Sequence, residues 1–487
     1  MRPDFVRQQY CPNLYSLATN GVFFRRNHCA YVSTTIVNGT VLARGTYPGH
    51  SGILANSDFR EELNSQTSIA SEVLETVRRV DLISGGKYVA VDTVAELIQA
   101  AGHYTYIAGT KSVTLLHDRS LRCEDTEAHR KSVTLGCGLS LPRAATERMN
   151  KANDDKVFPN TDTIPNVASD TWTIKALTHG LWKNGVPKYS LLWLSDPDKT
   201  QHAKGVGAPE SLAAIEASDK NLGEVLKVLE QKGIRGKTDL MVVSDHGFSS
   251  VARGGDIPGA LRRAGLNAHT KLENPEPGDV VVVELGGSAL IYVIDHREDV
   301  IRKAATVLQG CDFSGVIFSR IELEGTFPLS TVKYPTDGHA PDLVVSMRWT
   351  DDKNDFGAPG YMMATGGTRG TGAHGSLSRF EMNNTLVATG PSFKRGFVSK
   401  TPSGNIDIAP TILHLLGITR PDSMDGRVLK EALAGNGAPA PELRERKLEA
   451  SRTVGFLRWD QYLRICDIEG VSYFASSAES VGGWRYR

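Results

Sequence analysis

The sequence predicts an α/β fold in which strands and helices alternate around a largely parallel sheet. Short β-branched runs follow one another along the chain, and amphipathic stretches of helical period separate them. The length of 487 residues, 40% of them hydrophobic, suits one large α/β domain with an insertion, or about three domain equivalents. We therefore expect a layered fold with helices packed against a central sheet.

The individual elements follow from these patterns. The predicted strands of the core are Tyr104–Ala108, Ser190–Leu194, Asp239–Ser244 and Leu386–Thr389. The predicted helices are Ser68–Val80, Asp92–Ala101, Glu210–Lys232 and Asp407–Leu416. Gly417 stands directly after the last of these helices, where a glycine commonly ends a helix.

Two segments read differently from this core. Residues 250–340 contain short apolar runs around a single helical pattern at Glu298–Leu308, which indicates a small α+β insertion. A Pro/Ala hinge near residue 440 precedes a charged stretch, Glu442–Arg452, which we expect to be helical and to be followed by short strands. We thus predict a core of residues 1–249 and 341–435, an insertion at 250–340 and a C-terminal extension at 436–487.

Composition excludes several classes of protein. The 55 basic and 55 acidic residues balance, so the charge gives no general attraction to nucleic acid, and we expect no nucleic-acid-binding module. No apolar run approaches the roughly 20 residues of a membrane-spanning helix. The six cysteines form no CxxC pair and are too few for a disulfide scaffold. No secretory signal opens the sequence as written, and the sequence leaves the location and the oligomeric state open.

Two strand ends carry residues that bind metals. Asp198 and His202 follow the strand at 190–194 and are four residues apart, so one helical turn would place both on one side. Asp245 and His246 directly follow the strand at 239–244. Ligand-bearing loops are expected at the carboxyl edge of a parallel sheet. Each pair alone has an ordinary alternative, a surface pair for the first and a turn with a capping aspartate for the second.

A third segment places His374 between Gly372 and Gly375, where glycines let the backbone approach a bound group closely. Aspartate and histidine together suit zinc, although manganese or iron accept the same ligands. A fourth segment offers a nucleophile, because Thr35 is predicted to begin a helix whose first N–H groups attract anions. Its ordinary alternative is a simple helix cap.

These segments, in this order, resemble the alkaline phosphatase superfamily and, within it, the type I phosphodiesterase/nucleotide pyrophosphatase family. The matching positions are Thr35, Asn38, Gly45–Pro48, Gly52–Ile53, Asp198/His202, Asp245/His246, His374, Asp407–Thr411 and Met424–Gly426. The resemblance spans residues 1 to about 430. It implies an alkaline-phosphatase-like three-layer sandwich with a mostly parallel central sheet, and a cap-like role for the 250–340 insertion.

The resemblance also implies a reaction and its cofactors. Two divalent metal ions, with zinc favoured, would lie at the sheet edge. Asp198, His202 and His374 would hold one, and Asp245, His246 and Thr35 the other. Thr35 would attack phosphorus and form a phosphothreonine, while Asn38 would hold a phosphoryl oxygen. The implied substrate is a small-molecule phosphate ester.

One departure from the family concerns the N-terminus. Met1-Arg2-Pro3-Asp4 matches the turn that follows the family's first strand, so that strand and its metal-binding aspartate are absent from the sequence. Either the sequence starts late, with an exported location then open, or this is a member with an impaired second metal site. A phosphonate or phosphomonoester hydrolase of the same superfamily is a further alternative. A sulfatase is excluded, because its Cys-x-Pro-x-Arg motif is missing.

Overall fold

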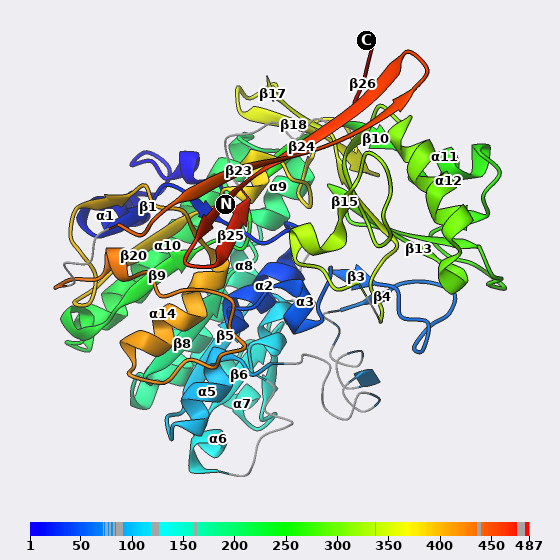
Figure 1. Cartoon of the computed structure of the whole chain (residues 1–487). Coiled ribbons are helices and arrows are strands. Elements are labelled where there is room, and N and C mark those ends of the chain that lie inside the picture. The colour runs from blue at the N-terminus through cyan, green and yellow to red at the C-terminus, as the bar shows by residue number, and fades with distance from the viewer. Residues whose placement is uncertain are drawn as a thin grey trace.

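The structure is a computed structural model of the whole chain (Figure 1). It describes all residues except 72, 74, 75, 77, 78, 81, 82, 84–90, 119–125, 160–162, 337, 436–439, 475–482 and 487. Of the helix predicted over Ser68–Val80, residues 72, 74, 75, 77 and 78 lie outside the described residues, and Thr76, Arg79 and Val80 are helical. Its beginning, β4 (Ile69–Ala70), is instead a short strand paired with β3 (Ser57–Asp58).

The core contains two four-stranded sheets. The first has the order β21-β1-β20-β9, and the second has the order β7-β6-β5-β8. Their strands are β21 (Phe397–Ser399), β1 (Val22–Phe24), β20 (Leu386–Thr389), β9 (Leu240–Val243), β7 (Leu139–Leu141), β6 (Val133–Gly136), β5 (Thr105–Gly109) and β8 (Tyr189–Trp193). All four predicted core strands are thus confirmed. The pairing is mixed, because β20 runs antiparallel to both of its neighbours whereas β5 runs parallel to β6 and β8.

Helices cover both faces of these sheets. One layer packs on the face that carries Leu192 and Val242 and consists of α1 (Pro12–Asn20), α7 (Ala145–Ala152), α8 (Val167–Lys175) and α10 (Pro209–Gln231). The opposite layer packs on the face that carries Trp193 and Met241 and consists of α2 (Thr35–Arg44), α5 (Val94–Ala100) and α14 (Ile408–Leu415). The chain therefore forms the expected three-layer sandwich. No helix in the described part of the chain has the length and apolarity to cross a bilayer.

The inner strands β8 and β9 differ from the others in exposure. Every residue of both strands is only half-buried, whereas β5 is buried throughout. Within the described residues β8 pairs only with β5, and β9 only with β20. Each strand therefore has one edge that makes no ladder.

The insertion forms its own six-stranded sheet, ordered β11-β12-β13-β16-β14-β15. Its strands are β11 (Ala268–His269), β12 (Val280–Glu284), β13 (Ser288–Val293), β16 (Leu343–Met347), β14 (Ser314–Ser319) and β15 (Phe327–Pro328), and α11 (Ile257–Arg263) and α12 (Glu298–Gln309) cover one face. Since β16 pairs with β13 and β14, this sheet extends past residue 340, the predicted boundary of the insertion. A smaller sheet of β17 (Trp349–Lys353), β18 (Pro359–Thr365), β10 (Ser249–Gly255) and β19 (Gly372–Ala373) leads back to the core.

The C-terminal extension corrects the sequence prediction. The stretch expected to be a helix over Glu442–Arg452 is β23 (Arg444–Val454), which pairs along its whole length with β24 (Leu457–Ile468). Its burial alternates residue by residue, and every second residue from Arg446 to Arg452 is partly covered. This period of two is that of a β-strand. The hairpin turn at Gly455 brings β24 alongside β23, and a prediction from helix propensity takes no account of such a pairing partner.

The hairpin of β23 and β24 connects the core to the insertion (Figure 1). Trp459 is fully buried in the insertion's apolar core and donates a hydrogen bond from Nε1 to the carbonyl of Gly325, at 3.0 Å. Leu463 and Ile465 pack where the insertion sheet meets the core, and Cys466 and Ile468 pack against α2. β25 (Val471–Phe474) and β26 (Gly483–Tyr486) add to β24.

Replacing Trp459 by alanine should lower the free energy of unfolding by about 3–5 kcal/mol, because a large buried ring and its hydrogen bond are lost. The matched control is Phe456→Ala at the hairpin tip, where the ring is 85% exposed. That change should stay within about 0.5 kcal/mol. Urea unfolding measures both, and equal effects of the two substitutions would contradict the packing role of the hairpin.

Candidate active site

Thr35 is the first residue of α2, as the sequence predicted. Thr34 before it is extended, and all ten residues of the helix are buried. The helix ends at Gly45, whose positive φ of 63° closes the last turn. Thr35 is 5% exposed, and its hydroxyl lies 3.3 Å from Nε2 of His246. A hydroxyl is thereby fixed at the positive end of a helix dipole, beside an imidazole.

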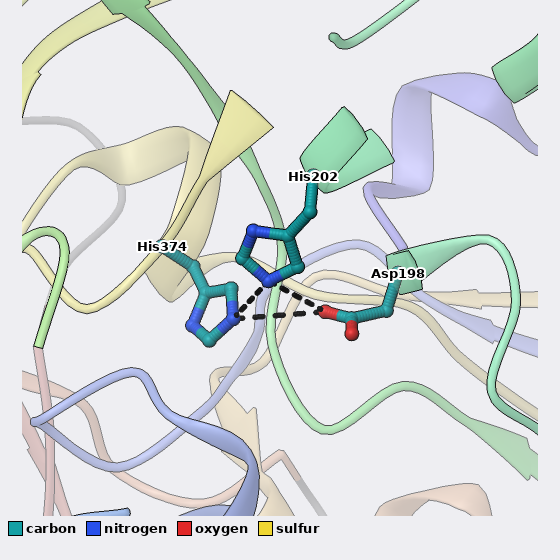
Figure 2. Close-up of side chains that lie close together, drawn as sticks. All are labelled: Asp198, His202 and His374. Atoms are coloured by element: carbon teal, nitrogen blue, oxygen red, sulfur yellow. Dashed lines mark hydrogen bonds and ion pairs between the residues drawn. The ribbon is translucent and has the colours of Figure 1, made fainter. Parts of the chain in front are cut away.

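The three residues Asp198, His202 and His374 meet as the sequence predicted, and we call them the metal-ligand cluster (Figure 2). Asp198 begins α9 (Asp198–Lys204), so His202 follows one turn later on the same side. His374 arrives from the segment directly after β19. Oδ1 of Asp198 lies 3.7 Å from Nε2 of His202 and 3.6 Å from Nε2 of His374.

A glycine permits this convergence. A Cβ at Gly372 would lie 2.4 Å from the carbonyl oxygen of Gln201, which is in α9. Gly372 thus allows β19 to pack closely on α9. The sequence analysis had instead related this glycine to the approach of the backbone to a bound group.

Backbone carbonyls orient the imidazoles. Nδ1 of His374 lies 2.8 Å from the Ser33 carbonyl, Nδ1 of His202 lies 3.1 Å from the Gly372 carbonyl, and Nδ1 of His246 lies 2.8 Å from that of Gly247. When Nδ1 donates to a carbonyl, Nε2 carries the lone pair, so each ring presents a metal-binding nitrogen to the site. Burial also lowers the pKa of His246 and of His374, which favours the neutral form.

Asp198 carries the negative charge of the cluster. Burial opposes its ionisation, but the Lys111 ammonium and the imidazoles of His202, His374 and His246 together hold the pKa of this carboxyl well below its usual range. Lys111 Nζ lies 2.5 Å from Oδ2. Oδ1 is buried without a hydrogen-bond partner among the described residues.

The cluster fits a divalent cation. Nε2 of His202 and Nε2 of His374 face one another at 3.1 Å, and two lone pairs at this distance repel unless a proton or a cation lies between them. The carboxylate oxygen beside them has no other partner in the described structure. One carboxylate and two neutral imidazoles are the ligand set of many zinc sites.

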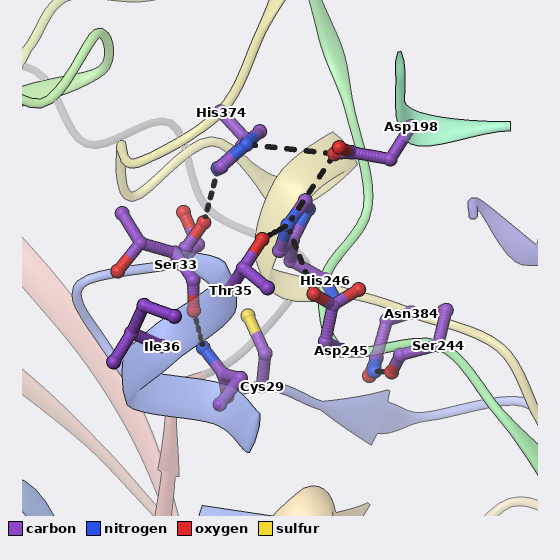
Figure 3. A network of polar contacts seen from close by, with 12 residues as sticks. Cys29, Ser33, Thr35, Ile36, Asp198, Ser244, Asp245, His246, His374 and Asn384 are labelled. Atoms are coloured by element: carbon purple, nitrogen blue, oxygen red, sulfur yellow. Dashed lines mark hydrogen bonds and ion pairs between the residues drawn. The ribbon is translucent and has the colours of Figure 1, made fainter. Parts of the chain in front are cut away.

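The second predicted group lies next to the first (Figure 3). Oδ2 of Asp245 is 3.3 Å from Nε2 of His246, and the same nitrogen is 3.7 Å from Oδ1 of Asp198. The His246 ring stacks on His374 with centroids 3.7 Å apart. Thr35, Asp245 and His246 are thus together, although the metal-ligand cluster is the only group of three or more histidine, cysteine or acidic ligands found among the described residues.

Asn38 does not face the site. Its side chain is fully buried, and Nδ2 donates to the carbonyls of Ala30, Val32 and Thr34 while Oδ1 accepts from the N–H of Ala30. Asn38 therefore fixes the loop that leads into α2. Its amide has no donor left for a phosphoryl oxygen.

Sequence reasoning missed two residues near Thr35 and Asp198. Asn56 is half-buried, and its Oδ1 accepts from the N–H of Ile36 at 2.8 Å, so its amide lies at the first turn of α2. Lys111 is the second residue after β5, at the carboxyl edge where the metal ligands were expected. The expectation that functional residues lie at the carboxyl ends of parallel strands could have identified Lys111. Asn56 lies in an irregular segment, to which this expectation does not apply.

The late segments of the sequence resemblance have a structural role. The N–H groups of Asp425 and Gly426 donate to the carbonyl of Gly45, and a carboxylate oxygen of Asp425 accepts from the N–H of Tyr47. These hydrogen bonds hold the turn after α2.

Asp407, in the other late segment, is buried, and the loss of hydration raises its pKa to about 6.

Comparisons with known proteins place this geometry in a family. The sequence model of the type I phosphodiesterase / nucleotide pyrophosphatase family matches residues 1–350. Among curated relatives, venom phosphodiesterases of Crotalus durissus collilineatus and Crotalus adamanteus are each 24% identical over 242 residues, which is 50% of this chain. The match spans only 24% of the length of these relatives.

Solved structures show the same fold. Murine ectonucleotide pyrophosphatase/phosphodiesterase 5 superposes with a TM-score of 0.61 at 18% identity over 89% of this chain and 97% of its own. An inactive form of the murine protein in complex with AMP gives the same values. The human protein gives 0.58 and 17%, over 87% of this chain and 95% of its own. With a family match over most of its length, this chain belongs to the type I phosphodiesterase / nucleotide pyrophosphatase family.

Proposed function

We propose that this protein is a metal-dependent hydrolase of phosphate esters, with nucleotide-like phosphodiesters as its substrates and Thr35 as its nucleophile. The observation that carries the proposal is the position of the Thr35 hydroxyl, at the start of a buried helix and 3.3 Å from His246, next to the metal-ligand cluster. The AMP complex of the murine neighbour supports the nucleotide class.

The reaction takes two displacements at phosphorus. In the first, Oγ1 of Thr35 forms a bond to phosphorus and the ester oxygen leaves as the alcohol. In the second, water attacks the phosphothreonine and restores the threonine hydroxyl. The N-terminus of α2, the positive end of its dipole, would lie where negative charge develops on the phosphoryl oxygens.

Metal ions supply the remaining electrostatic stabilisation. Asp198, His202 and His374 would hold one divalent cation, and Asp245, His246 and Thr35 would hold a second. Zinc fits these ligands best, and when bound it stabilises negative charge on oxygen and favours the ionised hydroxyl. We assign the amide contact with the phosphoryl group to Asn56 instead of Asn38, since only Asn56 is partly exposed at the start of α2.

Lys111 favours a second candidate, hydrolysis of phosphomonoesters or phosphonates. Its ammonium contacts Oδ2 of Asp198 and is 24% exposed. A positive charge at this place offsets the additional negative charge that a monoester or phosphonate carries relative to a diester. The two candidates share Thr35 and the metal-ligand cluster and differ only in how strongly they depend on Lys111.

Thr35→Ala should reduce turnover of bis(p-nitrophenyl) phosphate at least about a thousandfold, because no nucleophilic oxygen remains. Thr35→Ser keeps the oxygen and should retain measurable turnover. Metal content of both variants, determined by elemental analysis, should keep the ion held by the metal-ligand cluster. Turnover by Thr35→Ala at the rate of the unchanged protein would refute the nucleophile assignment.

Asn56→Ala should lower activity, whereas Asn38→Ala should lower stability. Loss of the Asn56 amide should lower kcat about a hundredfold with little change in stability. Loss of Asn38 leaves buried carbonyls unpaired and should lower the free energy of unfolding by about 1–3 kcal/mol. Steady-state kinetics and urea unfolding of both variants distinguish the two roles. A large loss of kcat in Asn38→Ala with no such loss in Asn56→Ala would assign the phosphoryl contact to Asn38.

Lys111→Met separates the two candidate substrates. If monoesters or phosphonates are the substrates, kcat/KM should fall about tenfold more for p-nitrophenyl phosphate than for the diester, since only the former carries the second charge. Lys204→Met at the other end of α9, where the ammonium pairs with Glu210, is the matched control. An equal effect of Lys111→Met on both esters favours the diesterase.

A further inference from the structure

A short helix, α13 (Arg379–Met382), lies against two of the segments that build the site. The carbonyl of Glu381 accepts from the N–H of Gly247 at 2.7 Å, directly after His246. The carbonyl of the next residue accepts from the N–H of Cys29 at 2.9 Å, in the loop that leads to α2. The backbone of α13 therefore holds both the segment of His246 and the loop before the nucleophile.

The side chain of Glu381 reaches a third segment, the one that carries His374. Its Oε2 accepts from the N–H of Ser376 at 2.6 Å and from the hydroxyl of Ser33 at 3.2 Å, and its Oε1 accepts from the hydroxyl of Ser376 at 2.7 Å. Ser33 is the residue whose carbonyl lies 2.8 Å from Nδ1 of His374, and its Oγ accepts from the N–H of Gly375 at 3.0 Å (Figure 3). One carboxyl group thus connects the loop before α2 to the turn after His374.

The environment of this carboxyl is unusual for an acidic side chain. Glu381 is fully buried and forms no ion pair among the described residues, and burial raises the pKa of its carboxyl. A buried carboxyl without a cationic partner destabilises a fold, whereas an apolar side chain at the same place would not. Hydrogen bonds that orient a ligand imidazole from outside the metal site are a function that offsets this cost.

We propose that Glu381 is a positioning residue, which fixes His374 through Ser33 so that the imidazole faces the rest of the metal-ligand cluster before an ion binds. The segment is then ordered during folding, and binding of the ion need not order it, which raises the affinity of the cluster. The inference rests on the proposed function, since it concerns the metal site of that hydrolase.

Zinc affinity of the whole chain, measured by competition with a chromogenic chelator, tests the proposal without any substrate. Glu381→Ala should weaken zinc binding about 10–100-fold, because the imidazole loses its outer support. Glu381→Gln keeps an oxygen for the N–H of Ser376 and should stay within about threefold of the unchanged protein. Ser33→Ala keeps the carbonyl that His374 contacts but removes the hydroxyl link, and it should weaken binding about tenfold even where Glu381→Ala does not fold.

The matched control is Asp219→Ala. Asp219 is another buried carboxylate, and it accepts from the N–H groups of Asn13 and Leu14 at the start of α1. Urea unfolding with excess chelator should show a loss of stability in this variant, while its zinc affinity stays unchanged. The double variant of Glu381→Ala and Ser33→Ala should bind zinc no more weakly than the weaker single variant, because both changes break the same connection.

Three results would overturn the proposal and leave the proposed function intact. Zinc affinity that is unchanged in Ser33→Ala or in folded Glu381→Ala would mean that the carboxyl only stabilises the fold. An equal loss of affinity in Asp219→Ala would mean that the effect is not specific to Glu381. A loss in Glu381→Gln as large as in Glu381→Ala would assign the effect to charge instead of position. If the unchanged protein binds no zinc, by contrast, the metal-dependent function itself fails, and this inference fails with it.

Discussion

The arrangement on which the rest of the site depends is a single carboxylate oxygen, Oδ1 of Asp198. It is buried without a hydrogen bond in the described structure, and the Nε2 atoms of His202, His246 and His374 lie at 3.6–3.7 Å from it. A buried charge needs compensation, and neutral imidazoles compensate it only through their dipoles. Lys111 supplies one positive charge, on the far oxygen. The near oxygen and the inward-facing nitrogens together form a place where a cation is strongly favoured.

Backbone geometry, more than side-chain contacts, fixes this arrangement. Nδ1 of His202 and Nδ1 of His374 are each anchored to a carbonyl of another segment, and Nδ1 of His246 is anchored to the carbonyl of the next residue, Gly247. Ser33, whose carbonyl anchors His374, is itself held: its hydroxyl donates to Glu381 and to the carbonyl of Ser376. The N–H and hydroxyl of Ser376 also donate to Glu381, whose pKa is raised by burial. The loop before α2 thereby positions the nucleophile and a metal ligand at the same time.

The sequence predicted the residues of the site better than their environment. Asp198, His202, Asp245, His246 and His374 follow strands or glycines at recognisable spacings, and the structure brings them together as expected. The spacing could not show which asparagine has a free amide, since that depends on the loop between Ala30 and Thr34, with which the Asn38 side chain bonds.

The fold, like the site, could be predicted from the sequence only in part. Periodicity located the core strands and the long helix α10, because their apolar residues pack together in the clusters between the sheets and the helix layers. It failed for Glu442–Arg452, where charged residues with good helix propensity form β23. The segment is a strand because it pairs with β24, which starts only three residues after β23 ends. Helix propensity describes a segment by itself and takes no account of a partner strand.

The position of the site between the two core sheets has a consequence for stability. Asp198 and Lys111 belong to the sheet that contains β8 and β5, whereas Asp245 and His246 follow β9 of the other sheet, and His374 comes from the segment that returns from the insertion. No ladder in the described structure joins these three units at this point. A cation held by the metal-ligand cluster would link the β8 side to the returning segment, and the stacking of His246 on His374 would connect the β9 side to them. Binding of a cation there would therefore stabilise the docking of the two core sheets, at a point where no ladder of the described structure joins them.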